Sequence, residues 1–361
     1  MRDAKIVTLY KNKGDRSDCN NYRGISLLSI VGKAYARVVL ARLQTLASRV
    51  YPESQCGFRA GRSTVDMIFS LRQLQEMCRD QHQPLFIAFI DLTKAFDLVS
   101  RSGLFSILKK IGCSPKLLQM VISFHENMQS SVRFNGGTSD SFSVRSGVKQ
   151  GCVLAPTLFG IFFSMVLKSA FRDCDEGVHV RTRTDGKLFN NSRLGAKTKV
   201  RKILIREMLF ADDAALISQS EDGLQELVNR LSIACEHFGL TISLKRTNIM
   251  AQGSNVVPNI TINNTNLEVV DSFKYLGATI TSSCSLEADI NSRLGKATAV
   301  MAKLEKRVWK NGLLSDNTKI KIYQACVLST LLYESESWAT NSIQEISLTA
   351  FTFAALGEFL Q

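Results

Sequence analysis

The sequence predicts an α+β protein in which short buried strands end in acidic residues and amphipathic helices cover the sheet. Three observations predict this class. Residues 85–90 form a continuous apolar run of strand length that ends at Asp91. Residues 208–217 read as two short strands joined by a tight bend that carries Asp212 and Asp213. Apolar side chains recur at helical spacing over residues 31–46, 67–77 and 221–238.

Length and charge narrow the class of protein. A chain of 361 residues is long enough for two or three packed units. Its formal net charge of +13 favours a polyanionic partner such as nucleic acid, although a basic soluble surface explains the same excess.

The cysteines and the apolar runs exclude further classes of protein. The nine cysteines are scattered without a C-x-x-C pair, so a zinc site is not supported and reduced thiols are expected. The N-terminus lacks the apolar region of a signal peptide, and the apolar run 158–167 is too short to cross a bilayer. We therefore expect a soluble intracellular protein of the nucleus and/or cytoplasm with no membrane partner.

The acidic bend of residues 208–217 is the stretch around which the chain is organised. Adjacent carboxylates repel each other, and an apolar setting disfavours their ionised form. A hard cation such as Mg²⁺ opposite Asp212 and Asp213 would keep both ionised. The alternative is a solvated hairpin turn, a common place for aspartate.

Asp91 follows a predicted buried strand, where functional groups of sheets are often found. The alternative is that Asp91 caps a helix that begins near Lys94. Asp97 lies further along that helix and is expected to be structural.

Two loops carry further candidates. Arg59 and Arg62 lie in a glycine-containing segment, residues 55–64, from which guanidinium groups can fork onto phosphate oxygens. Solvated surface arginines are the alternative. Gln150 and Gly151 precede a long apolar helix; the glycine permits close approach, and the amide both donates and accepts hydrogen bonds.

The remaining pattern predicts several further elements. Helix 31–46 is expected to bury one face that includes Val31, Tyr35, Val38, Val39, Leu43 and Leu46. We also expect a helix over 116–128, strands over 131–135 and 141–145, a strand pair over 240–250 with Lys245 in its bend, and a boundary within 251–266. Residues 172–206, with ten Lys/Arg against four Asp/Glu, predict a basic ribbon turning at Asp185-Gly186, either a phosphate contact or a solvated insertion.

Seven stretches together resemble the reverse transcriptase of non-LTR (LINE-like) retrotransposons. They occur in the order of that family and span nearly the whole chain. They are NYRGISLL (21–28), QCGFRAGRSTVD (55–66), FIDLTKAFD (89–97), GVKQGCVLAP (147–156), FADD (210–213), LKRTN (244–248) and YLG (275–277).

The resemblance implies a right-hand polymerase whose palm is a ferredoxin-like antiparallel sheet backed by helices. The fingers would comprise residues 1–80 and the palm 81–250, with the basic hairpin insertion at 172–206. Residues 251–361 would hold the palm end and a partial helical thumb. Such elements usually also encode an endonuclease, which this sequence does not show.

The resemblance also implies roles for single residues. Asp91 and Asp212 would ligate two Mg²⁺ ions, or Mn²⁺ as a substitute, with help from the Leu92 carbonyl. Asp213 would support the primer end. Phe96 would be a gate that excludes a ribose 2′-hydroxyl. Gln150 and Gly151 would contact nucleotide and template, Arg59 and Arg62 the triphosphate, and Lys245 the departing pyrophosphate.

The function that the resemblance implies is RNA-directed DNA polymerase activity, with template RNA, a DNA primer and dNTPs as partners and no stable protein partner to be inferred. Viral RNA polymerases usually carry a carboxylate where this chain has Phe96, which favours deoxynucleotides. Two alternatives stay open: a catalytically impaired remnant that only binds nucleic acid, and a group II intron maturase, which would require a basic domain after the thumb.

Overall fold

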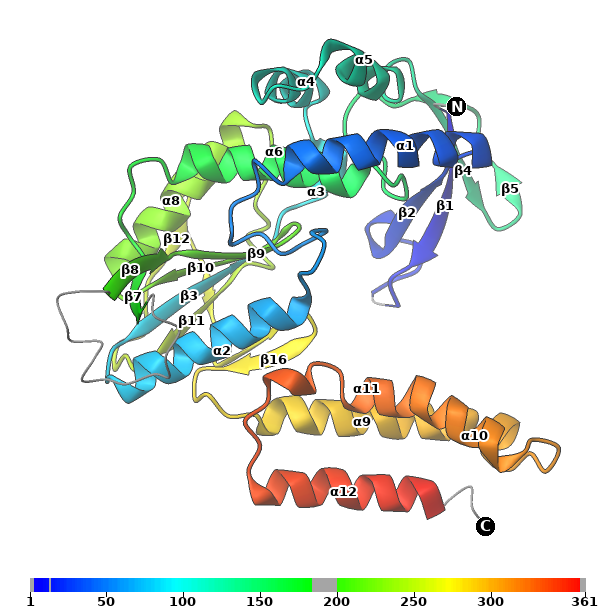
Figure 1. Ribbon diagram of the computed structural model, residues 1–361, viewed down its shortest axis with the longest axis vertical. Coiled ribbons are helices and arrows are strands. Elements are labelled where there is room, and N and C mark those ends of the chain that lie inside the picture. Colours follow the sequence, from blue (N-terminus) through cyan, green and yellow to red (C-terminus); the bar gives the residue numbers. More distant parts are fainter. Residues whose placement is uncertain (1–2, 13, 184–199, 358–361) are drawn as a thin grey trace. The chain divides into compact units, whose positions relative to one another are not determined.

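The computed structural model describes residues 3–12, 14–183 and 200–357, shown as coloured ribbon in Figure 1. The chain forms two compact units. The first comprises residues 1–62, 86–249 and 258–268, and the second residues 63–85, 250–257 and 269–361. The division into fingers, palm and thumb stays a prediction.

The described residues form both strands and helices. The strands are β1 (Ala4–Tyr10), β2 (Tyr22–Leu27), β3 (Leu85–Ile90), β4 (Gln129–Phe134), β5 (Gly137–Thr138), β6 (Phe142–Ser143), β7 (Val178–Arg183), β8 (Val200–Ile205), β9 (Glu207–Phe210), β10 (Asp213–Ser218), β11 (Asn248–Gln252), β12 (Thr261–Ile262), β13 (Thr265–Asn266), β14 (Glu268–Val269), β15 (Ser272–Tyr275) and β16 (Ala278–Thr281). The helices are α1 (Ile30–Ala47), α2 (Thr64–Asp80), α3 (Ala95–Leu98), α4 (Arg101–Lys110), α5 (Pro115–Ser123), α6 (Ala155–Ala170), α8 (Glu221–His237), α9 (Glu287–Leu304), α10 (Asp316–Ile322), α11 (Ser329–Leu331) and α12 (Ser342–Gly357).

The central sheet of the first unit has the order β14-β11-β3-β10-β9. Strand β10 pairs antiparallel with both β3 and β9. All six residues of β3 are buried, which explains why its sequence is a continuous apolar run and not an alternating one. Helices α6 and α8 lie together over one face of this sheet (Figure 1).

A second sheet of the first unit forms around β1, which pairs antiparallel with β2 and parallel with β4. Strand β4 in turn pairs with the short strands β5 and β6. The predicted hairpin about Gly136 is therefore present, but its second strand is split into two short pieces. The predicted helix 116–128 ends earlier, at Ser123.

Helix α1 covers the predicted residues and buries Val39, Leu43 and Leu46 as predicted, but the rest of its buried face differs from the predicted one. Val31 and Val38 are each 61% exposed, whereas Gly32, Ala36 and Ala47 are buried. Helix α1 packs beside α6 and α5. Apolarity alone favoured the larger valines, and this part of the prediction was wrong.

The predicted strand pair over 240–250 is replaced by a single strand, β11, preceded by a turn that contains Lys245. The segment before that turn pairs with the loop after β3 instead. The Ser243 amide donates to the Asp91 carbonyl at 2.8 Å, and Ile242 forms an isolated bridge with Leu92. The predicted basic ribbon is the β7–β8 pair, and its expected turn at Asp185-Gly186 lies outside the described residues.

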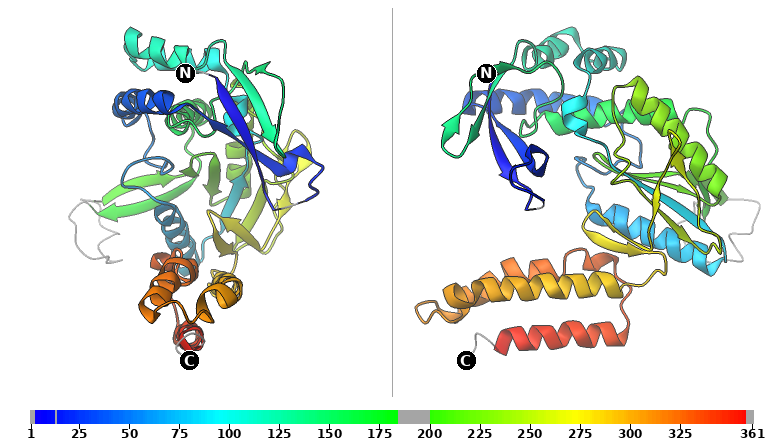
Figure 2. Two further views of the ribbon diagram at one scale, coloured as in Figure 1. Left: turned by 90° about the vertical axis from the view of Figure 1, so that its right-hand side faces the viewer. Right: turned by 180° about the vertical axis from the view of Figure 1, so that it is seen from behind.

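The second unit has a helical core. Helices α9, α10, α11 and α12 run alongside one another (Figure 2) and enclose Met301, Trp309, Val327 and Leu331. Across the described part of the chain, no helix is long and apolar enough to span a membrane.

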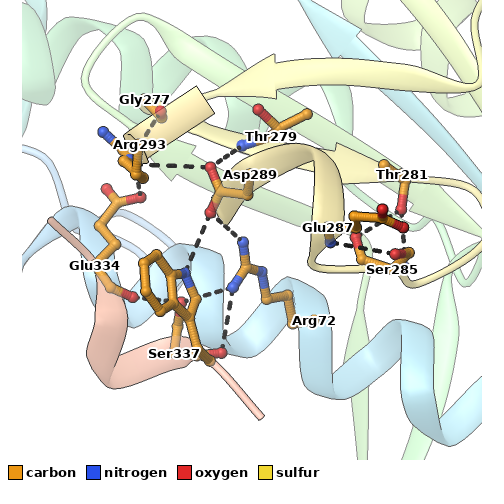
Figure 3. Close-up of polar contacts among 11 residues, drawn as sticks. Arg72, Gly277, Thr279, Thr281, Ser285, Glu287, Asp289, Arg293, Glu334 and Ser337 are labelled. Atoms are coloured by element: carbon orange, nitrogen blue, oxygen red, sulfur yellow. Dashed lines mark hydrogen bonds and ion pairs between the residues drawn. The ribbon is translucent and has the colours of Figure 1, made fainter. Parts of the chain in front are cut away.

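A buried polar network ties the second unit together (Figure 3). Asp289, on α9, is 1% exposed; it accepts a hydrogen bond from the Thr279 amide at 2.9 Å and forms an ion pair with Arg72, on α2, at 2.9 Å. Trp338 donates its indole N–H to the same carboxylate at 3.2 Å. One acidic side chain thus joins β16, α2 and the segment before α12.

Arg293 extends this network. It lies 3.8 Å from Asp289 and 3.7 Å from Glu334, and it donates a hydrogen bond to the Gly277 carbonyl at 2.7 Å. Glu334 is buried. Burial raises the pKa of Glu334 to about 7, although Arg293 acts in the opposite direction.

Substitution of Asp289 by Asn is expected to destabilise the second unit by about 3–5 kcal/mol, because the buried Arg72 would lose its counter-charge and Arg293 one of its two acidic partners. Chemical denaturation measures the change. The matched control is Glu305→Gln, whose partner Lys310 is largely exposed, so its loss should change stability far less. Equal effects for the two variants would contradict the role of Asp289.

Substitution of Glu334 by Gln is expected to change how stability depends on pH. Since the folded state raises the pKa of Glu334 from 4.5 to about 7, stability due to its protonated form is lost as pH rises through that interval. The unfolding free energy of the wild type relative to Glu334→Gln should therefore fall between these two pH values. Urea titrations across the range test this, and parallel profiles would refute it.

Candidate active site

Asp91 and the pair Asp212-Asp213 meet at one end of the central sheet. Ile90, the last residue of β3, pairs with Ala214 of β10. Asp91 follows Ile90 and Asp213 precedes Ala214, so the two acids continue the same antiparallel register. Opposite Cα atoms in such pairs lie about 5 Å apart. The structure therefore brings together acidic residues that are far apart in the sequence.

The carboxylates at this edge affect one another. Burial and, after it, the charges of Asp212 and Asp91 together raise the pKa of Asp213 to about 6. Burial also raises the pKa of Asp212, against the lowering effect of Arg23 and Arg246. These acids are thus held close enough to repel, in a setting that disfavours their charge.

Arg246 is a cation in direct contact with Asp91. Its guanidinium forms an ion pair with the Asp91 carboxylate at 3.0 Å, and both side chains are partly exposed, Arg246 51% and Asp91 31%. The Thr247 hydroxyl accepts a hydrogen bond from the Asp91 amide at 3.3 Å. Asp91 does not cap the following helix, because the N-cap of α3 is Lys94.

Lys245, the predicted basic residue of this segment, lies exposed in the turn beside Arg246. Arg246 and Arg23 are the residues that sequence reasoning did not select. The sequence shows two adjacent cations at 245 and 246, and residue type alone does not tell which of them faces the acids.

Phe96 lies on α3 and stacks on the buried ring of Phe159, with ring centroids 4.5 Å apart. Its carbonyl accepts a hydrogen bond from the Val148 amide at 2.8 Å. The aromatic ring is therefore fixed by α6 and by the loop that leads to Gln150.

Gln150 and Gly151 are held against strand β2. The Gln150 carbonyl accepts a hydrogen bond from the Ser26 amide at 2.7 Å. Gly151 has a φ of +101°, and a Cβ atom there would lie 2.6 Å from the Ser26 carbonyl oxygen. Packing against β2 thus explains the glycine without a ligand, and a role in nucleotide contact stays a prediction.

Arg59 and Arg62 share one acidic partner. Arg59 forms an ion pair with Glu53 at 3.1 Å, and Arg62 contacts the other oxygen of the same carboxylate. Glu53 is 71% exposed. The two guanidinium groups therefore lie close together, with the Glu53 carboxylate between them.

The acids provide the oxygen ligands that divalent cations prefer. Like-charge repulsion between Asp91, Asp212 and Asp213 would be relieved by a cation, which fits such a site. Within the described ranges, no three His, Cys, Asp or Glu side chains are already arranged as a metal cluster. The donors that fit are the carboxylates of Asp91 and Asp212 and, next to them, the backbone carbonyl of the buried Leu92.

Comparison with known proteins decides the family. The sequence profile described as "Reverse transcriptase (RNA-dependent DNA polymerase)" matches residues 10–280. The chain belongs to the reverse transcriptase family. That match contains all the predicted site residues, from Arg59 to Lys245, and enzymes of this family generally depend on a divalent metal ion.

Curated relatives come from non-LTR retrotransposons, which confirms the resemblance in the sequence. The chain is 26% identical over 347 residues to the probable RNA-directed DNA polymerase from transposon BS of Drosophila melanogaster, covering 93% of this chain and 35% of the relative. It is 27% identical over 341 residues to the RNA-directed DNA polymerase from mobile element jockey of Drosophila funebris, covering 91% of this chain and 34% of the relative. The chain thus spans about a third of the length of these relatives.

Solved structures agree on the fold. Apo telomerase from Candida tropicalis is similar with a TM-score of 0.54 at 12% identity, covering 99% of this chain and 62% of that chain. The form truncated from its C-terminal domain has a TM-score of 0.51 at 13% identity, covering 79% of this chain and 54% of that chain. The predicted right-hand polymerase fold is confirmed.

Proposed function

We propose that this chain is the polymerase part of a retrotransposon protein and extends a DNA primer with dNTPs on an RNA template. The observation that carries the proposal is the convergence of Asp91 with Asp212-Asp213 at the end of the paired strands β3 and β10, within a reverse transcriptase sequence. Since RNA templates and dNTPs occur inside the cell, we also propose an intracellular location.

The proposed reaction is nucleotidyl transfer. The primer 3′-hydroxyl releases its proton to solvent and its oxygen forms a bond to the α-phosphorus of the dNTP, while the bond from that phosphorus to the bridging oxygen breaks and pyrophosphate leaves. Asp91 and Asp212 would hold two Mg²⁺ ions, for which Mn²⁺ could substitute, together with the Leu92 carbonyl. When bound, the ions supply charge neutralisation at the attacking and leaving oxygens.

The other residues of the site would bind and orient the substrates. Arg59 and Arg62 would leave Glu53 and bind the triphosphate. Lys245 or, by its position beside Asp91, Arg246 would contact the phosphates next to the acids. Gln150 and Gly151 would border the nucleotide and template, and the fixed ring of Phe96 would lie under the sugar.

The second candidate function is a nucleic-acid-binding remnant without catalysis. The net charge of +13 supports binding of nucleic acid in either case. The position of Asp91 and Asp213 next to a paired register, with Asp212 in the adjoining turn, favours catalysis, because binding of polyanions alone gains nothing from a cluster of carboxylates.

Primer extension on poly(A)/oligo(dT) with Mg²⁺ tests the proposal. The wild type is expected to extend the primer, and Asp212→Asn to lose at least about 10³-fold of that activity, because the neutral amide cannot hold the cation that stabilises transferring charge. The control is Asp140→Asn, an exposed aspartate of the same unit. A wild type that binds template-primer without extending it would support the remnant instead.

Phe96→Ala is expected to raise incorporation of ribonucleotides relative to deoxynucleotides by at least about tenfold, because the bulk that excludes the 2′-hydroxyl is removed. The measurement is single-nucleotide extension with dTTP and UTP. Phe134→Ala, a substitution at a half-exposed ring elsewhere in the same unit, controls for general loosening. Unchanged sugar discrimination in Phe96→Ala would refute the gate.

A further inference from the structure

The turn that carries the acidic pair contains a strained residue. Phe210 and Asp213 are paired across the hairpin, so Ala211 and Asp212 form its two-residue loop. Ala211 has a φ of +61°, a left-handed conformation that is unfavourable for a residue with a Cβ atom. Hairpin loops that need a positive φ at this first position usually have glycine there. Something else must therefore hold Ala211 in place.

Gln55 binds both backbone polar groups of Ala211. Its Oε1 accepts a hydrogen bond from the Ala211 amide at 3.0 Å, and its Nε2 donates to the Ala211 carbonyl at 3.3 Å. The same Oε1 accepts from the Gly57 amide at 2.7 Å. Gln55 has no exposed surface, so its amide is fully engaged with the backbone.

The segment around Gln55 is itself fixed to the hairpin. The Cys56 amide donates to the Leu209 carbonyl at 2.9 Å, and the Leu209 amide donates to the Ser54 carbonyl at 3.0 Å. Gly57 lies so close that a Cβ atom there would overlap the backbone nitrogen of Ala211. Residues 54–57 thus line the edge strand β9 and follow it to the turn.

We propose that Gln55 is a positioning residue that sets the geometry of Asp212 and Asp213 by clamping the strained Ala211; its effect on catalysis rests on the proposed function. An amide is suited to this task because a single side chain must donate to a carbonyl and accept from two N–H groups. Because it is buried, Gln55 does not contact substrate and acts only through the turn.

The segment that carries the clamp also carries the arginines. Glu53, which holds Arg59 and Arg62, lies two residues before Gln55. Residues 53–57 therefore connect the turn of the acids to the segment from which the two arginines project. Loss of the Gln55 hydrogen bonds should shift Asp212 and Asp213 relative to a bound dNTP, while every group that binds the dNTP remains present.

The test uses Gln55→Met, which keeps the volume of the side chain and removes its hydrogen bonds. The matched control is Gln75→Met: Gln75 is 2% exposed and donates to the Thr281 carbonyl at 3.0 Å in the second unit. Hydrogen exchange over residues 207–214 reads out the turn, and steady-state extension reads out kcat and KM. Should Gln55→Met not fold, Gln55→Glu, which keeps the acceptor, is measured in the same way.

Gln55→Met is expected to speed exchange over residues 207–214 by at least tenfold, with β3 unchanged. It should lower kcat by about 10²-fold with the KM for dNTP changed less than about threefold, since misplacement by about 1 Å costs this much. Gln75→Met should show neither change. Unaltered exchange in the turn, or a kcat no lower than that of Gln75→Met, would overturn the proposal. If the wild type does not polymerise, only the proposed function fails, because the exchange measurement still decides the clamp.

Discussion

The antiparallel register of β3 and β10 determines which side chains share one end of the central sheet. Because Ile90 lies opposite Ala214, the next residue of one strand and the preceding residue of the other are both aspartates. A shift of the register by one residue would turn one of the two acids to the other face. The apolar side chains of β3 are all buried, and repacking them would make such a shift costly. Core packing therefore keeps Asp91 next to Asp213.

Two acidic centres in this chain show how a structural carboxylate differs from the carboxylates of a candidate active site. Asp289 is fully buried and meets two guanidinium groups, an indole N–H and a backbone amide, so its charge is satisfied. The acids beside Asp91 are instead close enough to raise the pKa of Asp213. Buried charges with complete partners hold elements together, whereas carboxylates that repel one another are the pattern expected of a site that receives a cation.

Much of this arrangement could be predicted from local patterns. The strand at 85–90 and the bend at Asp212-Asp213 appear as predicted. Both are visible in the local sequence, because a buried strand requires a run of apolar residues and a tight bend interrupts such a run. Contacts between distant segments are not visible in this way. Nothing near Gln55 indicates that its amide reaches Ala211, and nothing at positions 245 and 246 indicates which side chain faces Asp91. The buried face of α1 was predicted only in part, because apolar character marks Val31 and Val38 but not the small buried residues Gly32 and Ala36.

The Glu53 carboxylate bridges Arg59 and Arg62 and is itself largely open to solvent. Any incoming phosphate group would have to exchange places with an anion that the chain supplies itself. A single carboxylate competes poorly with a triphosphate, which carries several charges, but competes effectively with a monophosphate or with chloride. The Glu53 carboxylate would thereby favour binding of the most highly charged ligands at Arg59 and Arg62, because only these displace it readily.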